Sequence, residues 1–259
     1  MTNIAEALRL APGVQVARID ANTWAISARG LNGLASSKLL VMIDGRTVYT
    51  PISAQVSWKL QDLLIEDIER IEIIRGPGAS LWGANAVNGI INIITKAPQQ
   101  TQGDLVTTYL GTGEEQAILG VRHAGKMKKG HYRVYGKVYK HDNFVDAAGV
   151  EQEDNWLMKR GGFRADINLT GRDNLTVQGD IYDGFNKRNL FVSRNEPPIT
   201  NYHTFVSGLN LLTRWKRNLT NGDIILQSYY DWVENDQTIL YKEQLGTYDI
   251  DFQHRWQAI

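Results

Sequence analysis

Residues 68–96 read IERIEIIRGPGASLWGANAVNGIINIITK, and this stretch decides the fold of the first part of the chain. Ile68 to Ile74 is rich in isoleucine and predicts a β-strand, and Gly89 to Thr95 predicts a second, buried strand. Between them Gly76-Pro77-Gly78 breaks the first strand sharply, because glycine permits positive φ and close backbone approach while proline fixes its own φ. We therefore expect two strands joined by a compact, glycine-rich excursion.

The residues before this stretch mix short helices with strands. Asn3 and Glu6 have the spacing of a helix capping box, and Pro12-Gly13 ends the helix that they open. A second helix is expected around Leu60 to Glu66. Three further extended segments are expected, at Val14 to Ile19, Thr23 to Ala28 and Lys38 to Ile43, the last of them closed by the turn Asp44-Gly45. Together these elements predict a small α+β domain.

A linker at Ala97-Pro98-Gln99-Gln100 separates this domain from a part that reads only as strands, so we expect domains at residues 1–97 and 98–259. From His131 to Tyr139 apolar or small residues occupy the even positions and polar residues most of the odd ones, the period of a strand with one apolar face. The same alternation recurs, and about eight strands are expected, near Leu105, Leu119, 131–139, 163–169, 175–181, 205–211, 224–232 and 248–255.

The connections between these strands alternate in length. Tight, polar turns are expected at Gly125 to Gly130, Thr170 to Asp173 and Arg217 to Gly222, and long polar loops at Asp142 to Asn155, Asn186 to Tyr202 and Glu234 to Glu243. Short turns at one end and long loops at the other are typical of an outer-membrane β-barrel, and Trp215 and Trp232 fit strand ends at headgroup depth. A soluble antiparallel sheet with one buried face gives the same period of two, so both readings stay open on the pattern alone.

Composition excludes several classes of function. Lys plus Arg and Asp plus Glu both total 28, so no net charge draws the chain towards nucleic acid, and the absence of cysteine excludes thiolate metal sites and cysteine nucleophiles. The apolar runs are far shorter than the ~18 residues of a membrane-spanning helix. Met1 to Glu6 is no secretory signal, so for an exported protein we expect the true N-terminus upstream.

The quoted stretch, together with LRLAPGV at residues 8–14, ISARGLNG at 26–33 and LLVMIDGR at 39–46, resembles the plug domain of TonB-dependent outer-membrane receptors. Four motifs occur in the order and spacing of that family and cover essentially all of residues 1–96, whereas the second part resembles the start of the family's barrel only generically. The resemblance implies an α+β plug followed by antiparallel transmembrane β-barrel strands.

The resemblance also implies a function, which is energised uptake across the outer membrane. The ligand would be a scarce chelate, a ferric siderophore first and otherwise haem or cobalamin, and the partners would be the TonB complex of the inner membrane and outer-membrane lipid. No cofactor is implied. Two alternatives remain: a non-transporting outer-membrane binding or signalling receptor, and a soluble module whose strands form a β-sandwich. Neither the ligand nor the segment that contacts TonB can be read from this sequence.

Candidate ligand-binding residues follow from the family's plug, whose apical loops correspond to Leu31 to Ser37 and Thr47 to Ser57. Loops on a rigid scaffold commonly carry binding residues, although an ordinary solvated loop is an equal alternative at each position. The expected ligand contacts are Asn32, Tyr49, Ser53, Gln55 and Trp58. Arg29 and Arg75 are expected to pair with barrel carboxylates as a latch between plug and barrel, the alternative being a purely structural ion pair.

Other chemistry finds little support in the sequence. Gly78 to Gly83 has the glycine spacing of a phosphate loop, but Ala84 and Asn85 stand where lysine and serine or threonine are needed. The five histidines lack metal-ligand spacing, and the acidic run from Glu151 to Asp154 is expected to be a solvated loop. No nucleophile and base can be assembled, so no enzyme is expected.

The last expectation is that the barrel is incomplete. An eight-stranded barrel has an interior only wide enough for its own side chains, whereas plugged transporters have about 22 strands. A plug of about 96 residues does not fit inside eight strands, so we expect further strands after Ile259.

Overall fold

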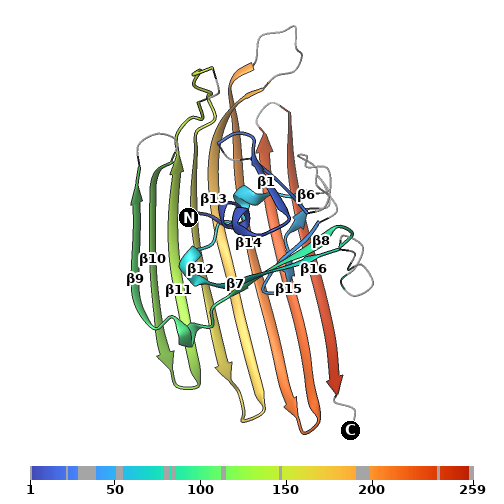
Figure 1. Cartoon of the computed structure of the whole chain (residues 1–259). Coiled ribbons are helices and arrows are strands. Elements are labelled where there is room, and N and C mark those ends of the chain that lie inside the picture. Colours follow the sequence, from blue (N-terminus) through green and yellow to red (C-terminus); the bar gives the residue numbers. More distant parts are fainter. Residues whose placement is uncertain are drawn as a thin grey trace. The chain divides into compact units, whose positions relative to one another are not determined.

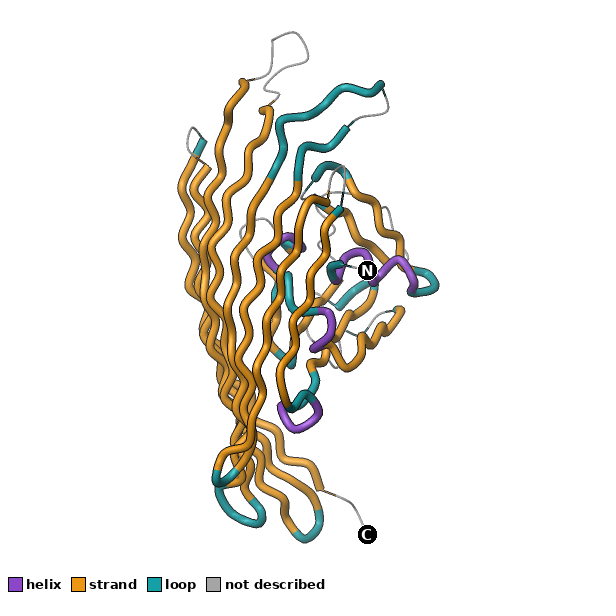
Figure 2. The backbone as a smooth tube through the Cα atoms, turned by 90° about the vertical axis from the view of Figure 1, so that its left-hand side faces the viewer, coloured by secondary structure: helices purple, strands orange, loops and turns teal. Residues whose placement is uncertain are grey.

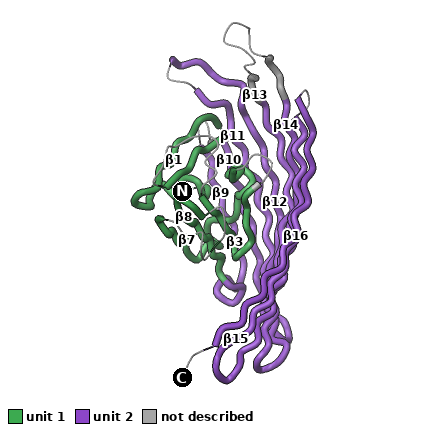
Figure 3. The backbone as a smooth tube through the Cα atoms, turned by 90° about the vertical axis from the view of Figure 1, so that its right-hand side faces the viewer, with its two compact units in different colours: residues 1–96 green, residues 97–259 purple. Residues whose placement is uncertain are grey.

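The computed structural model describes residues 2–21, 23–28, 39–50, 55–76, 78, 82, 86–111, 115–145, 148–190, 199–237 and 240–256. The chain divides into two compact units, Met1–Lys96 and Ala97–Ile259 (Figure 3). Figure 1 labels the helices and strands, and Figure 2 shows that helix is confined to short segments. Within the described ranges, no helix has both the length and the apolar character needed to cross a membrane.

Unit 1 opens with helix α1 (Ile4–Ala7), followed by the 3-10 helix η1 (Leu8–Leu10). Asn3 caps α1 as predicted, because its side chain accepts a hydrogen bond of 2.9 Å from the Glu6 backbone N–H. The Glu6 carboxylate does not complete the capping box. It accepts from the Trp24 indole at 3.1 Å and pairs with Arg9 at 2.7 Å, so it ties the helix to strand β2.

Strands β1 (Val14–Arg18) and β2 (Trp24–Ala28) form an antiparallel hairpin. The larger sheet of unit 1 has the order β4-β3-β8-β7, with bounds Arg46–Thr47 (β4), Leu39–Ile43 (β3), Gly89–Thr95 (β8) and Ile68–Arg75 (β7). β3 and β8 are parallel and central, and β7 runs antiparallel to β8. Both central strands are largely buried, which explains their continuous apolar sequences.

Two glycines of residues 68–96 are required by the backbone geometry. Gly76 adopts φ 121°, a value that side chains rarely allow, and its N–H donates to the Asn88 carbonyl at 3.1 Å. A Cβ atom on Gly89 would lie 2.6 Å from the Ile74 carbonyl oxygen. The motif therefore permits a turn and a close pairing of β7 with β8, in agreement with the packing role expected for it.

The helix expected around Leu60 to Glu66 is not formed. The segment instead contains two 3-10 helices, η2 (Trp58–Leu60) and η3 (Ile65–Asp67), with irregular backbone between them. Seven residues are too few for a stable isolated helix. Leu63, Leu64 and Asp62 are all buried, so no single helical face would have served this segment. A two-stranded ribbon of β5 (Tyr49–Thr50) and β6 (Gln55–Val56), not expected from the sequence, precedes it.

Unit 2 begins with the 3-10 helix η4 (Pro98–Gln100) and continues as one antiparallel sheet of eight strands in sequence order. The strands are β9 (Gly103–Leu110), β10 (Glu115–Met127), β11 (Gly130–His141), β12 (Trp156–Asn168), β13 (Asp173–Leu190), β14 (Ile199–Leu219), β15 (Gly222–Gln237) and β16 (Tyr241–Trp256). Every pair of neighbours is a hairpin. The expected run of eight antiparallel strands is confirmed.

The connections differ from the expected loops in two places. The three tight turns lie where they were expected, and the described part of residues 142–155 belongs to a long connection. At the loop expected at Asn186 to Tyr202, β13 runs on to Leu190 and β14 begins at Ile199, so strands occupy both of its ends. The strands β15 and β16, however, extend through most of the loop expected at Glu234 to Glu243 and leave only three residues between them. Opposite charges pair across this ladder, with Lys242 Nζ 2.7 Å from the Glu234 carboxylate. Cross-strand charge pairs stabilise a strand that its polarity alone does not predict.

The two faces of this sheet differ in character. One cross-strand row carries Val134, Phe163, Leu211, Tyr230 and Tyr248, all of them exposed. A row on the opposite face is polar throughout and consists of His131, Asp166, Thr176, Arg214, Gln227 and Asp251. The alternation read from the sequence thus separates an exposed apolar face from a polar one.

Candidate functional site

The expected ligand contacts on unit 1 gather around the ribbon of β5 and β6. Tyr49 pairs with Val56 across the ribbon, Gln55 lies in β6, and Trp58 begins η2 just after it. Tyr49 and Gln55 are partly exposed, whereas Trp58 is only 8% exposed. Asn32 and Ser53 lie outside the described residues. The structure therefore brings three of the five predicted residues into one neighbourhood.

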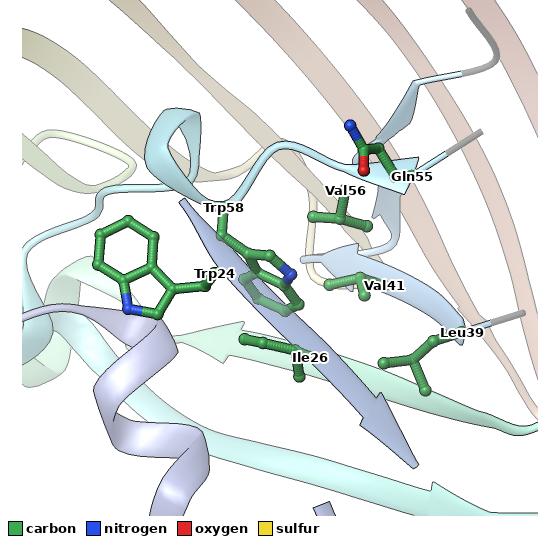
Figure 4. Close-up of a pocket in the computed structure, with 7 residues that line it drawn as sticks. All are labelled: Trp24, Ile26, Leu39, Val41, Gln55, Val56 and Trp58. Carbon is green, nitrogen blue, oxygen red and sulfur yellow. The ribbon is translucent and has the colours of Figure 1, made fainter. Parts of the chain in front are cut away.

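A small cavity lies between this ribbon and the strands below it (Figure 4). Its walls come from β2, β3, β6 and η2, and the residues are Trp24, Ile26, Leu39, Val41, Gln55, Val56 and Trp58. The free volume is about 10 Å³, the space of a single water molecule. The cavity is thus a packing feature behind the ribbon rather than a pocket for a chelate, and Trp24, which the sequence did not single out, is part of its wall.

Arg75 ends β7 and is exposed, and its Nη1 donates to the Pro12 carbonyl at 3.3 Å. The same guanidinium covers Gly13, where a Cβ atom would meet Nη1 at 3.0 Å. Arg75 therefore closes the turn between η1 and β1 within unit 1. Arg29 lies outside the described residues.

A charged network on β7 was not expected from the sequence. Arg70 Nε lies 2.8 Å from Glu72, its Nη1 lies 3.0 Å from Glu69, and Asn92 of β8 donates to Glu72 at 3.0 Å. The hydrogen bonds from Arg70 and then Asn92 lower the pKa of the Glu72 carboxyl. These charges line a strand at the edge of the sheet, where charged side chains discourage pairing with other chains.

The polar face of unit 2 combines cations with aromatic rings. The Arg160 guanidinium lies 4.7 Å from the centre of the Tyr182 ring, and Lys137 Nζ lies 5.6 Å from that of Tyr139. Nearer the long connection, the His141 ring stacks on Trp156 with 5.9 Å between centroids. Such a face can recognise an anionic or aromatic ligand, but each of these groups is buried, at 8% exposure or less.

The histidines and the acidic loop have structural roles. All five histidines lie on strands, and four of them pack against aromatic rings: His123 on Tyr132, His141 on Trp156, His203 on Phe185 and His254 on Trp256. In the acidic segment, Asp154 is buried and accepts from the Phe144 N–H at 2.7 Å, so the solvated loop expected there is partly an ordered one. Across the described residues, no group of three His, Cys, Asp or Glu side chains could hold a metal ion.

Comparison with known proteins now adds to this geometry. Residues 1–90 match the family described as TonB-dependent Receptor Plug Domain. This first part of the chain is therefore a TonB-dependent receptor plug domain. The chain is 31% identical over 171 residues to the vitamin B12 transporter BtuB of Vibrio cholerae, with 64% of this chain and 26% of the relative covered. It is 26% identical over 159 residues to the ferric enterobactin receptor PirA of Pseudomonas aeruginosa, with 55% and 21% covered.

Solved structures support the fold of the whole receptor chain. The siderophore receptor PirA from Acinetobacter baumannii matches with a TM-score of 0.72 at 18% identity, over 98% of this chain and 43% of that one. The ferric yersiniabactin uptake receptor FyuA from Yersinia pestis gives 0.71 at 14% identity, with the same coverage. The receptor chain spans about a quarter of the length of its curated relatives. Since these relatives are transporters and receptors, the expectation that it is no enzyme is confirmed.

Proposed function

We propose that the protein containing this chain is an outer-membrane receptor that takes up a scarce chelate with energy from the TonB complex. The apolar band on unit 2 carries this proposal. On β13 the residues that face outward between Asp173 and Asp183 are Leu175, Val177, Gly179 and Ile181. Six residue steps span about 20 Å at roughly 3.3 Å each, close to the ~25 Å apolar band of outer-membrane barrels.

The neighbouring strands continue this apolar band and the row of charged residues at its end. Phe163 of β12 and Leu211 of β14 lie in the same rows, and Lys159 and Glu234 share the row of Asp183 at the long-loop end. Trp215 and Trp232 lie near opposite ends of the band, at the positions that tryptophan favours between hydrocarbon and headgroups. A soluble β-sandwich would cover this face with a second sheet. Among the described residues, its large apolar side chains are instead exposed.

The names of the relatives point to two classes of ligand. One relative is named as a vitamin B12 transporter and another as a ferric enterobactin receptor. The structural neighbours given above are named as receptors for siderophores or for ferric yersiniabactin. We place a ferric siderophore first and cobalamin second.

A measurement of chelate uptake distinguishes the proposed transporter from a non-transporting receptor and from a soluble module. The gene would be deleted in its source organism, and cells would be supplied with radiolabelled ferric siderophores or cobalamin, with and without a protonophore. We expect deletion to abolish uptake of one chelate, and the protonophore to have the same effect on wild-type cells. Binding without any loss of uptake would indicate a non-transporting receptor. Recovery of the protein in the aqueous fraction would indicate a soluble module.

The ligand contacts remain those expected from the sequence: Asn32, Tyr49, Ser53, Gln55 and Trp58. Tyr49 and Gln55 offer partly exposed polar groups, and Trp58 supports the ribbon from behind. We expect Gln55→Ala to weaken chelate binding to the full-length receptor by about tenfold, since a hydrogen bond to a buried ligand is worth about 1 kcal/mol or more. Gln61→Ala, six residues away and outside the cavity wall, serves as the control.

We also propose the latch between plug and barrel that was expected from the sequence, in which Arg29 and Arg75 pair with barrel carboxylates. Replacing Arg75 by glutamine removes the positive charge, and because glutamine is shorter it also removes the hydrogen bond from Nη1 to the Pro12 carbonyl. We expect Arg75→Gln to slow uptake while the affinity for the chelate stays unchanged. Arg70→Gln is the matched control, because Arg70 lies on the same strand but pairs within unit 1. Equal uptake by both variants and the wild type would remove the latch.

A further inference from the structure

The short-turn end of the sheet carries cations that have no acidic partner. The first turn, between β10 and β11, contributes Lys128 and Lys129, and the second turn, between β12 and β13, contributes Arg172. All three side chains are exposed. Within the part of the chain that the structure describes, none of the three forms an ion pair or a side-chain hydrogen bond.

The carboxylates near this end already have other partners. Asp173 accepts from Arg217 at 2.8 and 3.0 Å, and Asp223 pairs with Arg255 at 2.9 Å and with Lys216 at 3.4 Å. The two carboxylates nearest the first turn have partners as well, Asp104 with His123 and Asp166 with Arg164. The positive charge of the first two turns therefore remains uncompensated.

Backbone hydrogen bonds hold these turns side by side. The Asn168 N–H donates to the Lys129 carbonyl at 2.7 Å, and the Asn218 N–H donates to the Arg172 carbonyl at 2.8 Å. The first turn thus adjoins the second, and the second adjoins the end of β14. The cations of the two turns therefore lie on neighbouring parts of the rim, and we refer to Lys128, Lys129 and Arg172 together as the strip.

An aromatic border separates this rim from the apolar band. Trp215, Phe252 and Trp256 lie on the apolar face near the same end, and the last two are 63% and 70% exposed. Trp215 donates its indole N–H to Asp173 at 3.1 Å, which fixes the ring beside the turn. Tryptophan at the edge of an apolar band marks headgroup depth, so the strip lies where lipid phosphates are found.

We propose that this strip, made of Lys128, Lys129 and Arg172, binds the anionic phospholipid headgroups of the leaflet that faces the short turns. Lysine and arginine both bind phosphate, and each cation near an anionic leaflet strengthens binding by roughly fivefold. At the opposite end, Lys242 differs from these cations, because it pairs with Glu234. The inference rests on the proposed membrane location but requires no transport activity.

Native mass spectrometry of the full-length receptor in detergent tests the strip directly. Equimolar phosphatidylglycerol and phosphatidylethanolamine with identical acyl chains would compete for the protein. We expect the wild type to retain phosphatidylglycerol with at least about tenfold preference. The variant Lys128→Gln/Lys129→Gln/Arg172→Gln should lose this preference. The control Lys140→Gln/Lys159→Gln/Lys187→Gln removes three charges at the other end and should keep it.

Three outcomes would overturn the proposal: no preference in the wild type, an equal loss in both triple variants, or retention of lipopolysaccharide by the strip in place of phosphatidylglycerol. Heat-modifiable mobility on gels, measured first, separates this failure from failure of the membrane assignment. A receptor that keeps its lipid preference but takes up no chelate would lose only the proposed function.

Discussion

At the scale of single residues, a few backbone positions of unit 1 limit substitution. Gly89 lets β8 approach β7, and Asp44 takes φ 51° in the turn after β3. The Asp44 carboxylate accepts from the Thr95 N–H at 2.9 Å and from its hydroxyl at 2.7 Å, which ties that turn to the end of β8. These contacts fix where the central strands begin and end.

Replacing Gly89 by alanine is expected to destabilise unit 1. The new Cβ atom would lie 2.6 Å from the Ile74 carbonyl oxygen, and because this atom belongs to the backbone it cannot move away as the end of a flexible side chain could. Overpacking of this kind costs roughly 1–3 kcal/mol. This loss of stability is measured by urea unfolding of the full-length receptor, followed with a signal that reports on unit 1. Val87→Ala, two residues away at an exposed position, should change little. An unchanged midpoint for Gly89→Ala would contradict the close approach.

The Glu72 carboxylate predicts a small pH dependence. Its pKa is lowered in the folded protein by the hydrogen bonds from Arg70 and Asn92. The stabilisation is therefore present above the ordinary glutamate pKa and is lost as the pH falls through the lower folded value. The difference in unfolding free energy between wild type and Glu72→Gln should shrink from pH 7 to pH 3.5. Glu66→Gln, which removes a carboxylate outside this network, should show no such change.

At the scale of secondary-structure elements, the strands of unit 2 follow from alternation, whereas several features of unit 1 do not. The period of two placed all eight strands because each has one apolar face. The helix expected around Leu60 to Glu66 was wrong, since burial on every side of this segment overrides its helical spacing. The contact between Trp24 and the ribbon joins residues more than thirty positions apart, and no local pattern reports such a contact.

The turn between β12 and β13 illustrates how an element is anchored. The Thr170 hydroxyl accepts from the Arg172 and Asp173 N–H groups at 3.2 and 3.0 Å. Arg217 of β14 then donates two hydrogen bonds to the Asp173 carboxylate. We expect Asp173→Ala to lower the temperature at which the folded gel band disappears by about 5 °C. Asp183→Ala, on the same strand at the other end, should have no comparable effect. Similar shifts in both variants would contradict a specific stabilisation of the turn by the contact between Arg217 and Asp173.

At the scale of the whole molecule, each unit has its own sheets and its own hydrogen bonding. Unit 1 buries Val41, Ile90, Ile91 and Ile93 completely without a disulfide or a long helix. The family and its fold could be predicted from the sequence because motif glycines and strand periods are local signals. The ligand contacts could not be predicted in this way, since binding residues on loops follow no local period, and Asn32 and Ser53 lie outside the described residues.

Residues 1–97 are expected to fold alone as a soluble α+β domain. Their helices and strands form a self-contained pattern, with a buried core provided by β3 and β8. Isotope-labelled protein should give well-dispersed amide signals in a proton–nitrogen NMR spectrum. Random-coil shifts would place the domain boundary elsewhere, and a matched fragment ending at residue 88, which lacks β8, should give them.

The parallel pairing of β3 with β8 sets the order in which unit 1 can form. Leu39 meets Gly89, its partner in the ladder, only after the fifty positions between them have been synthesised. Until then the buried strand β3 has only the two residues of β4 beside it, and closing so long a loop is slow compared with forming a hairpin. The sheet of unit 2 has no such delay, because each strand pairs with the one made just before it. A nascent chain therefore carries an unpaired, aggregation-prone strand until β8 emerges from the ribosome, and chaperones that bind extended apolar segments should associate most strongly in that interval.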